Sequence, residues 1–304
     1  MQKLSDMKKQ NRKGKTLALL LALAMAALVS LWNISKAMAA VNMWNGNFSH
    51  SWTDIETDIQ STHVKIARTY NSRSLYDGMF GFGWCSTVDV TVKRERPLHF
   101  NECELDVSTI NPPGFRLLRD NDGRIEQIWF QDRSIAEFKY DPTGKLIRVR
   151  AGSRMEKNYA YQDDELIDAR DGDGIGPTYR YDTLHNLTNI EYPDQTTEIM
   201  SYDDDRDLIT SRQGRDGCLE IYRFSSRQQT KHITAKATRK CGGLIVGTSR
   251  HDFWHATTPD GHTYLARIAI ERLGQTKHSK KEFRFDSEGR LTTARTGGMN
   301  NGLL

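Results

Sequence analysis

Tyrosine residues return at nearly constant intervals through the middle of this 304-residue chain, and this repeat limits the fold more than any other feature. The tyrosines stand at positions 140, 161, 181 and 202, which gives steps of 21, 20 and 21 residues. A unit of about 20 residues is too short to bury an apolar face by itself. The units must therefore stack side by side and share one continuous core.

Each tyrosine opens a similar unit. In most units an aspartate follows the aromatic residue and a leucine stands six positions after it. The unit at Tyr161 departs from this pattern, because its leucine comes five positions later and Gln162 replaces the aspartate. A last unit begins at a phenylalanine near the carboxyl end of the chain. The repeat residues are Tyr140, Asp141, Tyr161, Tyr181, Asp182, Tyr202, Asp203, Phe285 and Asp286.

These residue types predict β-hairpins. Side chains alternate across a strand, so an aromatic-x-aromatic triplet places two rings on one face. The aspartate begins the turn, where its carboxylate accepts hydrogen bonds from backbone N–H groups, and a late Gly or Asn supplies a positive φ. Turn residues at short intervals argue against helices. The predicted fold class is all-β, with antiparallel hairpin repeats forming a curved, extended sheet, an N-terminal β domain and a cleaved signal helix.

Residues 1–39 are typical of a secretory signal. A basic stretch precedes an uncharged apolar run from Leu17 to Trp32, and small residues, Ala37 and Ala39, occupy the two positions that a signal peptidase reads. We expect cleavage after Ala39, with an uncleaved membrane anchor as the alternative. Cleavage would leave an exported protein of the periplasm, the cell envelope or the extracellular space, with no integral membrane span.

Removing this segment changes the net charge. The full chain carries +4, whereas residues 40–304 hold 36 basic and 38 acidic side chains, a net charge of −2. The basicity of the whole chain therefore belongs to the signal. No basic stripe is expected to remain for phosphates, so nucleic acid is not expected as a partner.

Four cysteines follow the signal, an even number for an oxidising compartment. They permit two disulfides in three possible connectivities. Pairing of neighbours would close two loops of about 20 residues, each worth about 3 kcal/mol by chain entropy. No Cys-x-x-Cys spacing indicates zinc or redox chemistry. The disulfide candidates are Cys85, Cys103, Cys218 and Cys241.

A second motif lies upstream of the repeats. Residues 67–74 read ARTYNSRS, and GMFGFGW follows at residues 78–84. Through this motif the chain resembles the Rhs/YD-repeat family, whose N-terminal domain carries a similar signature. The segment IEYPDQ at residues 190–195 is similar to the family's YPDG pattern, with Gln195 in place of the usual glycine. The motif residues are Arg68, Tyr70, Asn71, Arg73, Gly78, Phe80, Gly81, Gly83 and Trp84.

We expect this motif to be structural. Arg68 and Arg73 should lie at a strand edge and in the loop after it, where they donate to turn carbonyls or carboxylates. The rings of Phe80, Phe82 and Trp84 should plug the end of the sheet. An exposed platform of these rings that stacks against sugars is the alternative.

The resemblance implies an antiparallel ribbon that, in long family members, closes into a hollow shell around a toxic or unfolded cargo. This chain has five or six recognisable repeats, fewer than a closed shell takes, and ends at Leu304 without the family's core-ending motif or an effector segment. Self-cleavage and a toxin tip are therefore not expected, and the front end of a longer gene is an alternative. The predicted domains are a signal peptide (1–39), an N-terminal Rhs-type β domain (40–118), a YD-repeat sheet (119–224) and a variable β segment with a terminal repeat (225–304).

Two groups of residues resemble metal sites. His251, His255 and His262 could lie near one another, but no acidic residue or cysteine completes a zinc-ligand spacing. The Asp-Gly turns at residues 171–174 and 121–123 lack the closing glutamate of a calcium loop. The sequence therefore predicts neither metal nor cofactor.

No group of residues predicts catalysis either. Asp54, Glu56 and Asp58 alternate, which is typical of a solvated strand face or a guarded edge. Neither a nucleophile elbow nor a phosphate loop occurs. The sequence favours a non-enzymatic, exported scaffold or binding module for a protein partner, which could be another Rhs-type chain, and a short relative of toxin-encapsulating shells. A lectin-like carbohydrate-binding module and a secreted hydrolase are the alternatives.

Overall fold

The structure, a computed structural model, describes residues 38–59, 62–86, 88, 114–152, 155–274 and 277–300. The described residues all belong to one unit, Met38–Leu304. They form strands, turns and loops, with one 3-10 turn at Gln228–Thr230. Residues 1–37 of the predicted signal peptide lie outside the described residues, and so does Cys103. Cys85, its neighbour among the predicted cysteines, is disulfide-bonded.

A four-stranded antiparallel sheet, the N-terminal sheet, forms first. It contains β1 (Met38–Val41), β2 (Phe48–Ile59), β3 (Thr62–Asn71) and β6 (Trp84–Ser86), in that order. A small hairpin of β4 (Asp77–Gly78) and β5 (Gly81–Phe82) lies between β3 and β6 in the chain. Met38 and Ala39, which cleavage at the predicted site would remove, pair with Ser51 and His50 of β2.

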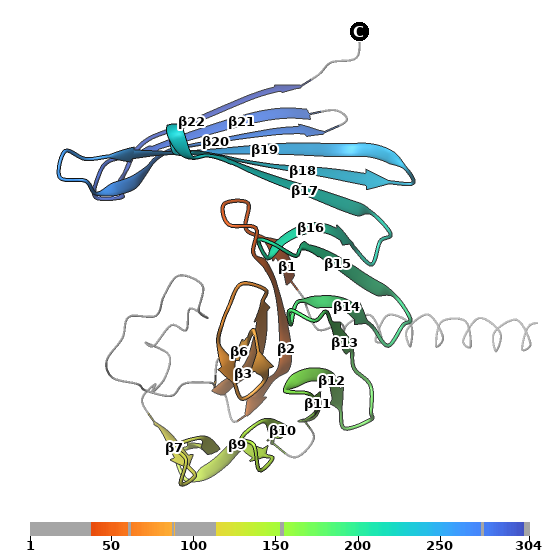
Figure 1. Ribbon diagram of the computed structural model, residues 1–304. Coiled ribbons are helices and arrows are strands. Elements are labelled where there is room, and N and C mark those ends of the chain that lie inside the picture. Colours follow the sequence, from red (N-terminus) through yellow and green to blue (C-terminus); the bar gives the residue numbers. More distant parts are fainter. Residues whose placement is uncertain are drawn as a thin grey trace, which may run out of the picture. The chain divides into compact units, whose positions relative to one another are not determined.

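The second sheet has 16 antiparallel strands, each hydrogen-bonded to the strands before and after it in the chain (Figure 1). Within the described residues β7 and β22 are its outer strands, so the sheet is open. These observations confirm the predicted all-β, antiparallel fold class. The strands are β7 (Phe115–Arg119), β8 (Ile125–Phe130), β9 (Arg133–Tyr140), β10 (Leu146–Ala151), β11 (Met155–Gln162), β12 (Glu165–Asp171), β13 (Thr178–Tyr181), β14 (Leu187–Glu191), β15 (Thr197–Asp203), β16 (Leu208–Gln213), β17 (Leu219–Arg227), β18 (His232–Cys241), β19 (Leu244–Thr257), β20 (Thr263–Gly274), β21 (Lys277–Phe285) and β22 (Leu291–Asn300).

The tyrosine period of the sequence becomes a period of contacts. Each of the four tyrosine hydroxyls donates to the backbone carbonyl 15 residues earlier, at 2.8–3.1 Å. The accepting residue is the buried apolar residue at or next to the start of the return strand of the preceding unit. Each unit is thereby tied to the one before it. The four pairs are Tyr140 with Ile125, Tyr161 with Leu146, Tyr181 with Leu166, and Tyr202 with Leu187.

The aspartate that follows the ring closes the turn. Asp141 Oδ1 accepts hydrogen bonds from the backbone N–H groups of Thr143 and Lys145, both at 2.9 Å. Asp182 makes the same contacts in the next-but-one unit. A β-bulge then shifts the register between Leu146 and Arg148, and similar bulges follow the other repeat turns. The predicted domain boundaries stay predictions, and the strand order continues without a break through residue 224.

Candidate functional site

The motif at residues 68–84 forms a buried contact between the N-terminal sheet and the repeat strands. The Arg68 side chain lies at its centre and has no exposed surface. Its Nε donates to Asp54 Oδ2 at 2.8 Å, and its Nη2 donates to Tyr179 Oη at 2.6 Å. Tyr159 Oη donates to the same Asp54 oxygen at 2.9 Å, and the Trp84 ring centroid lies 4.8 Å from the guanidinium carbon. We call Asp54, Arg68, Trp84, Tyr159 and Tyr179 the seam.

Three groups of the seam, Arg68, Tyr159 and Tyr179, stay protonated near neutral pH. Burial lowers the pKa of Arg68, but the Asp54 carboxylate and the two tyrosines outweigh burial and hold this pKa above its usual value. Burial raises the pKa of Tyr179 and of Tyr159 well above the ordinary tyrosine value. None of the three exchanges a proton near neutral pH, so the arrangement suits a structural link.

Other residues of the motif hold the repeat strands directly. Tyr70 Oη accepts a hydrogen bond from the Leu187 backbone N–H at 2.9 Å and donates to the His185 carbonyl at 3.3 Å. Trp84 Nε1 donates to the Tyr181 hydroxyl at 2.9 Å. Tyr181 in turn donates to the unit before it, so the motif is continuous with the tyrosine ladder of the repeats.

Arg73 reaches the turn between β15 and β16. Its Nη1 donates to the backbone carbonyls of Arg206 and Asp207, at 2.9 and 3.2 Å. Asn71 closes the motif on itself, because its backbone N–H donates to the Gly83 carbonyl at 2.8 Å. The motif therefore contacts the repeat sheet from β10, where the Leu146 N–H donates to the Met79 carbonyl, to the turn between β15 and β16.

The glycines of the motif allow close approach. Gly81 has a φ of +86°, and a Cβ there would lie 2.2 Å from the Asp164 carbonyl oxygen. Gly83 has a φ of +76°, and a Cβ would lie 2.9 Å from the Tyr70 ring. Gly78 pairs with Gly81 in the β4–β5 hairpin. Larger residues at 81 or 83 would push the motif away from the repeats.

One alternative and two expectations for this region are wrong. Phe80 and Trp84 have no exposed surface, so they cannot form an exposed sugar platform. Asp54 is not on a solvated face, since a bulge between Thr53 and Ile55 shifts the alternation and its side chain is 2% exposed. Arg68 is not at a sheet edge, because β3 lies between β2 and β6. The bulge and the long-range ion pair together explain these differences.

Strands β17–β22 lie beyond the N-terminal sheet (Figure 1). One of their faces is apolar, because Ile233, Phe253, Ile268 and Phe283 are direct partners across β18–β21. Trp44 stacks against Phe253 with ring centroids 6.4 Å apart. Most of the other apolar side chains are only partly buried. We call this surface the inner face, and it consists of Phe224, Ile233, Phe253, Ile268, Ile270 and Phe283.

The opposite, outer face of these strands is charged. Asp252 accepts hydrogen bonds from Arg250 at 2.7 Å and from His232 at 2.9 Å. Glu282 accepts from Arg267 at 2.8 Å. Asp252 itself is buried, but its partner Arg250 is half exposed and Arg267 is partly exposed, and ion pairs of such exposed arginines contribute little stability each, typically below about 1 kcal/mol. The outer face is therefore a solvated surface. Burial of the apolar inner face against a partner would be more favourable than burial of the outer face.

Charge is unevenly distributed along the large sheet. Residues 219–304 hold 15 Lys and Arg against 7 Asp and Glu, a net charge of +8. Residues 114–218 hold 15 against 22, a net charge of −7. The expectation that no basic stripe remains after the signal was based on the total charge, which conceals the net positive charge of β17–β22. Counting charges segment by segment would have found this region.

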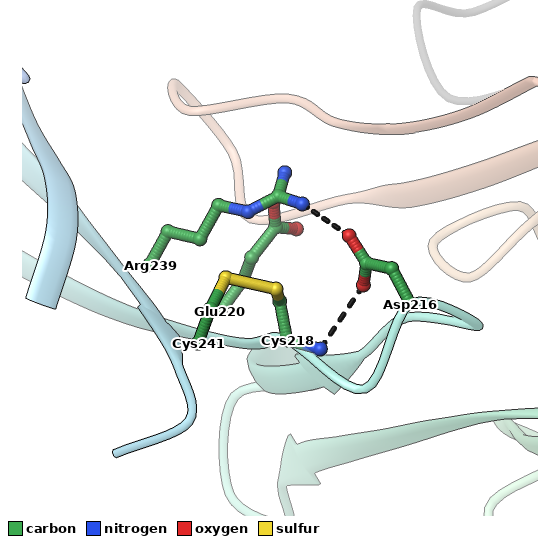
Figure 2. The surroundings of a disulfide bond; sticks show 5 residues. All are labelled: Asp216, Cys218, Glu220, Arg239 and Cys241. Carbon is green, nitrogen blue, oxygen red and sulfur yellow. Dashed lines mark hydrogen bonds and ion pairs between the residues drawn. A yellow bond between two sulfur atoms is a disulfide. The ribbon is translucent and has the colours of Figure 1, made fainter. Parts of the chain in front are cut away.

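A disulfide joins Cys218 and Cys241 where the two halves of the sheet meet (Figure 2). Their Cα atoms are 4.4 Å apart and the residues are 23 positions apart in the chain. Asp216 Oδ1 accepts a hydrogen bond from the Cys218 backbone N–H at 3.0 Å, and Asp216 Oδ2 accepts from Arg239 (Figure 2). Arg239 also lies 3.5 Å from a Glu220 oxygen. The bond fixes the open end of the β17–β18 hairpin.

A pocket of about 320 Å³ lies beside this disulfide. Arg212 bridges Glu198 and Glu220 in it, at 2.7 and 3.3 Å. Tyr192 Oη donates to Glu198 at 2.9 Å. Three arginines and three carboxylates line the pocket in all; Arg212 and Arg239 pair with these carboxylates, and Arg215 pairs with Asp194 just outside the lining. The pocket therefore carries no uncompensated charge that would attract an ion.

The sequence candidates for metal binding do not come together. No group of three or more metal-ligating side chains occurs within the part of the chain that the structure describes. His255 packs against Trp44, 6.0 Å between ring centroids, whereas His262 is exposed in a turn. Asp171 accepts hydrogen bonds from the backbone N–H groups of Asp173 and Ile175, which is turn geometry.

Comparisons with known proteins give one family match. A family model described as a domain of unknown function, DUF6531, matches residues 39–110, which include the motif at residues 68–84. No curated protein matches the sequence.

Solved structures give weak matches. A chain of the crystal structure of TcdB2-TccC3-Cdc42 is 9% identical with a TM-score of 0.31, and the match covers 84% of this chain and 16% of that chain. A chain of the crystal structure of TcdB2-TccC3 is 7% identical with a TM-score of 0.29, over 82% of this chain and 19% of that chain. The chain thus spans less than a fifth of the length of these two chains, and a likeness this weak carries no argument.

Among the described residues no helix is both long and apolar enough to span a membrane.

Proposed function

We propose that this is an exported, non-enzymatic protein of the Rhs/YD-repeat kind that binds or scaffolds another protein. One observation carries the proposal: the core face of the large sheet continues past the N-terminal sheet as the partly exposed inner face. Contiguous apolar surface on a stable protein marks interaction sites. A protein partner that covers this face would bury phenylalanine and isoleucine side chains, the usual source of affinity at an interface core.

Three further observations support parts of the proposal. The Cys218–Cys241 disulfide suits an oxidising compartment, as export requires. The strongly shifted groups of the seam are buried in structural contacts and offer no proton donor or acceptor near neutral pH, which suits a non-enzymatic role. The tyrosine repeat, whose hydroxyls tie the units together, and the motif at residues 67–84 are the features through which the sequence resembles Rhs/YD-repeat proteins.

Photo-crosslinking in the cells that make the protein tests the proposal. A benzophenone amino acid replaces Phe283, on the inner face of β21, or the neighbouring Arg284 on the outer face. Because the two positions differ only in the face that they occupy, we expect a discrete crosslinked protein from position 283 and none from position 284. Equal crosslinking from both positions, or none from either, would contradict a binding role for the inner face.

Light scattering of the purified chain measures its mass in solution and distinguishes a binding module from a scaffold. A monomer indicates a self-contained binding module. A defined oligomer indicates a scaffold in which copies cover one another's apolar surface.

A further inference from the structure

The pairing between β16 and β17 stops a third of the way along β17. Only residues 219–221 of β17 pair with β16, whereas all nine residues of β17 pair with β18. From residue 222 to residue 227, β17 therefore has a neighbouring strand on one side only, within the described residues. This is an open edge in the interior of the strand order rather than at its end.

The backbone groups on this open side can be assigned from the turn that precedes β17. The Cys218 carbonyl accepts a hydrogen bond from the Gly214 N–H, on the β16 side. Strand residues alternate in the side to which their backbone groups point, so the even-numbered residues of β17 face β16. Phe224 and Ser226 thus direct N–H and C=O groups toward the open side, where none of the described strands pairs with them.

The β16 side of this open edge is partly closed. The Ile209 N–H of β16 donates to the Gly46 carbonyl at 3.1 Å, and a Cβ at Gly46 would lie 2.7 Å from the Leu208 side chain. A loop of the N-terminal region therefore occupies the β16 side. An added strand would pair with β17 rather than bridge both strands.

A cleft of about 490 Å³ lies at this split. That volume is within the usual range for ligand sites. Its walls are apolar at Leu208 and Phe224 and basic at Arg206, Arg223 and Lys236, and no carboxylate lines it. Asp203 neutralises Arg206 through an ion pair of 2.5 Å.

The other two cations are not neutralised. Arg223 and Lys236 are direct cross-strand partners in β17 and β18. Both are exposed, and neither makes a side-chain ion pair with any described residue. Like charges directly opposite one another destabilise a strand pair. A carboxylate placed between them would remove this repulsion.

We infer that the β16–β17 cleft binds an extended, acidic segment of a protein partner, which adds to the open edge of β17 as a strand. Backbone hydrogen bonds to Phe224 and Ser226 give affinity, and acidic side chains that meet Arg223 and Lys236 give selectivity. The inference rests on the proposed function, since it specifies the chemistry of a partner and a second place where that partner is held.

A labelled peptide of ten alternating glutamate and valine residues provides the test, measured by fluorescence anisotropy against the purified full chain. We expect binding that weakens as salt is added. Charge reversal at the cleft, Arg223→Glu with Lys236→Glu, should weaken binding at least tenfold. The matched control, Lys280→Glu with Arg295→Glu, reverses two charges on the outer face of β21 and β22 and should change binding less than twofold.

Ser226 separates strand addition from simple charge attraction. Ser226→Pro removes an N–H that points to the open side and should weaken binding at least fivefold, whereas Ser226→Ala keeps the N–H and should bind as the wild type does. Circular dichroism of each variant establishes that the fold is retained.

Three results would overturn the inference: equal loss of binding in the cleft and control variants, no effect of Ser226→Pro, or tighter binding of a single-stranded oligonucleotide that depends on the same two cations. The proposed function fails separately. If the peptide does not bind while position 283 still crosslinks, only the cleft is excluded; if the peptide binds and position 283 does not crosslink, the inner face is excluded.

Discussion

Strands β7–β16 and strands β17–β22 belong to one continuous sheet, but different contacts hold them in place. In the first group each unit is tied to the preceding one by a tyrosine hydroxyl, and the N-terminal sheet packs on the core face through the seam. In the second group strands of up to 14 residues pair over most of their length, and a disulfide fixes their beginning. The first group carries −7 and the second +8.

This difference indicates that strands β7–β16 have a structural role, whereas strands β17–β22 expose an apolar surface. The apolar side chains of the repeat strands are buried in the contact with the N-terminal sheet, where Leu146, Leu166 and Leu187 have no exposed surface. In the terminal unit the equivalent Leu291 is 56% exposed, and Phe285 has no hydroxyl to donate. The same sequence pattern therefore gives a closed core in one region and an accessible surface in the other, because among the described residues only the first region packs against a second sheet.

Removing the seam cation should have the largest effect and should be confined to the repeat half. Arg68→Met leaves Asp54 buried without its ion-pair partner, which costs about 3–5 kcal/mol. Urea unfolding followed by tryptophan fluorescence measures the loss. Hydrogen exchange should show faster opening of β11–β14 than of β18–β21. Arg180→Met, at an exposed repeat position, is the control and should change stability by less than about 0.5 kcal/mol; an equal loss there would remove the special role of the seam.

Removing the disulfide should have the next largest effect, in the other half. Cys218→Ala with Cys241→Ala removes the cross-link between two residues that are 23 positions apart. Chain entropy predicts that the free energy of unfolding falls by about 3 kcal/mol. Hydrogen exchange should rise first in β17 and β18, while β11–β14 stay protected. Thr238→Ala in the same hairpin is the control for substitution alone. Protection lost uniformly over both halves would mean that the sheet unfolds as one unit, and the comparison would fail.

Acid should destabilise the part of the molecule that contains the seam, through the buried His50, which is 1% exposed. Burial, together with the charges of Arg212 and Arg68, lowers the pKa of His50 from 6.5 to about 3. Between these values the unfolded state binds a proton that the folded state does not, so stability falls as pH drops below 6.5. At pH 5 the loss is about 2 kcal/mol relative to pH 7. Urea unfolding at both pH values measures it.

His50→Gln should remove most of this pH difference, and His262→Gln, in an exposed turn, should leave it as in the wild type. A wild-type difference that persists in His50→Gln would assign the effect to other groups. His251 is the next candidate, because burial and then the Arg272 charge lower its pKa in the second half of the sheet.

The local features of the repeat could be predicted from the sequence, and the long-range ones could not. Ring, aspartate and leucine at fixed offsets indicate hairpins because turns and strands depend on neighbouring residues. The preference for Tyr over Phe was the available signal for the hydroxyl ladder, since a ring that only packs needs no hydroxyl. The burial of Asp54 depends on a bulge and on Arg68, 14 positions away, and alternation alone indicates the opposite.

Tyr202→Phe tests the ladder itself and should have the smallest effect. The change removes the hydroxyl that donates to the Leu187 carbonyl at 3.1 Å and leaves that carbonyl without this partner, at a cost of about 1 kcal/mol. Tyr264→Phe in β20 is the matched control in the second half, where no such ladder occurs among the described strands, and it should change stability by less than about 0.5 kcal/mol. Thermal unfolding of both variants measures the difference. If the two substitutions cost the same, tyrosine hydroxyls do not distinguish the repeat half, and the burial of its core face alone accounts for its order.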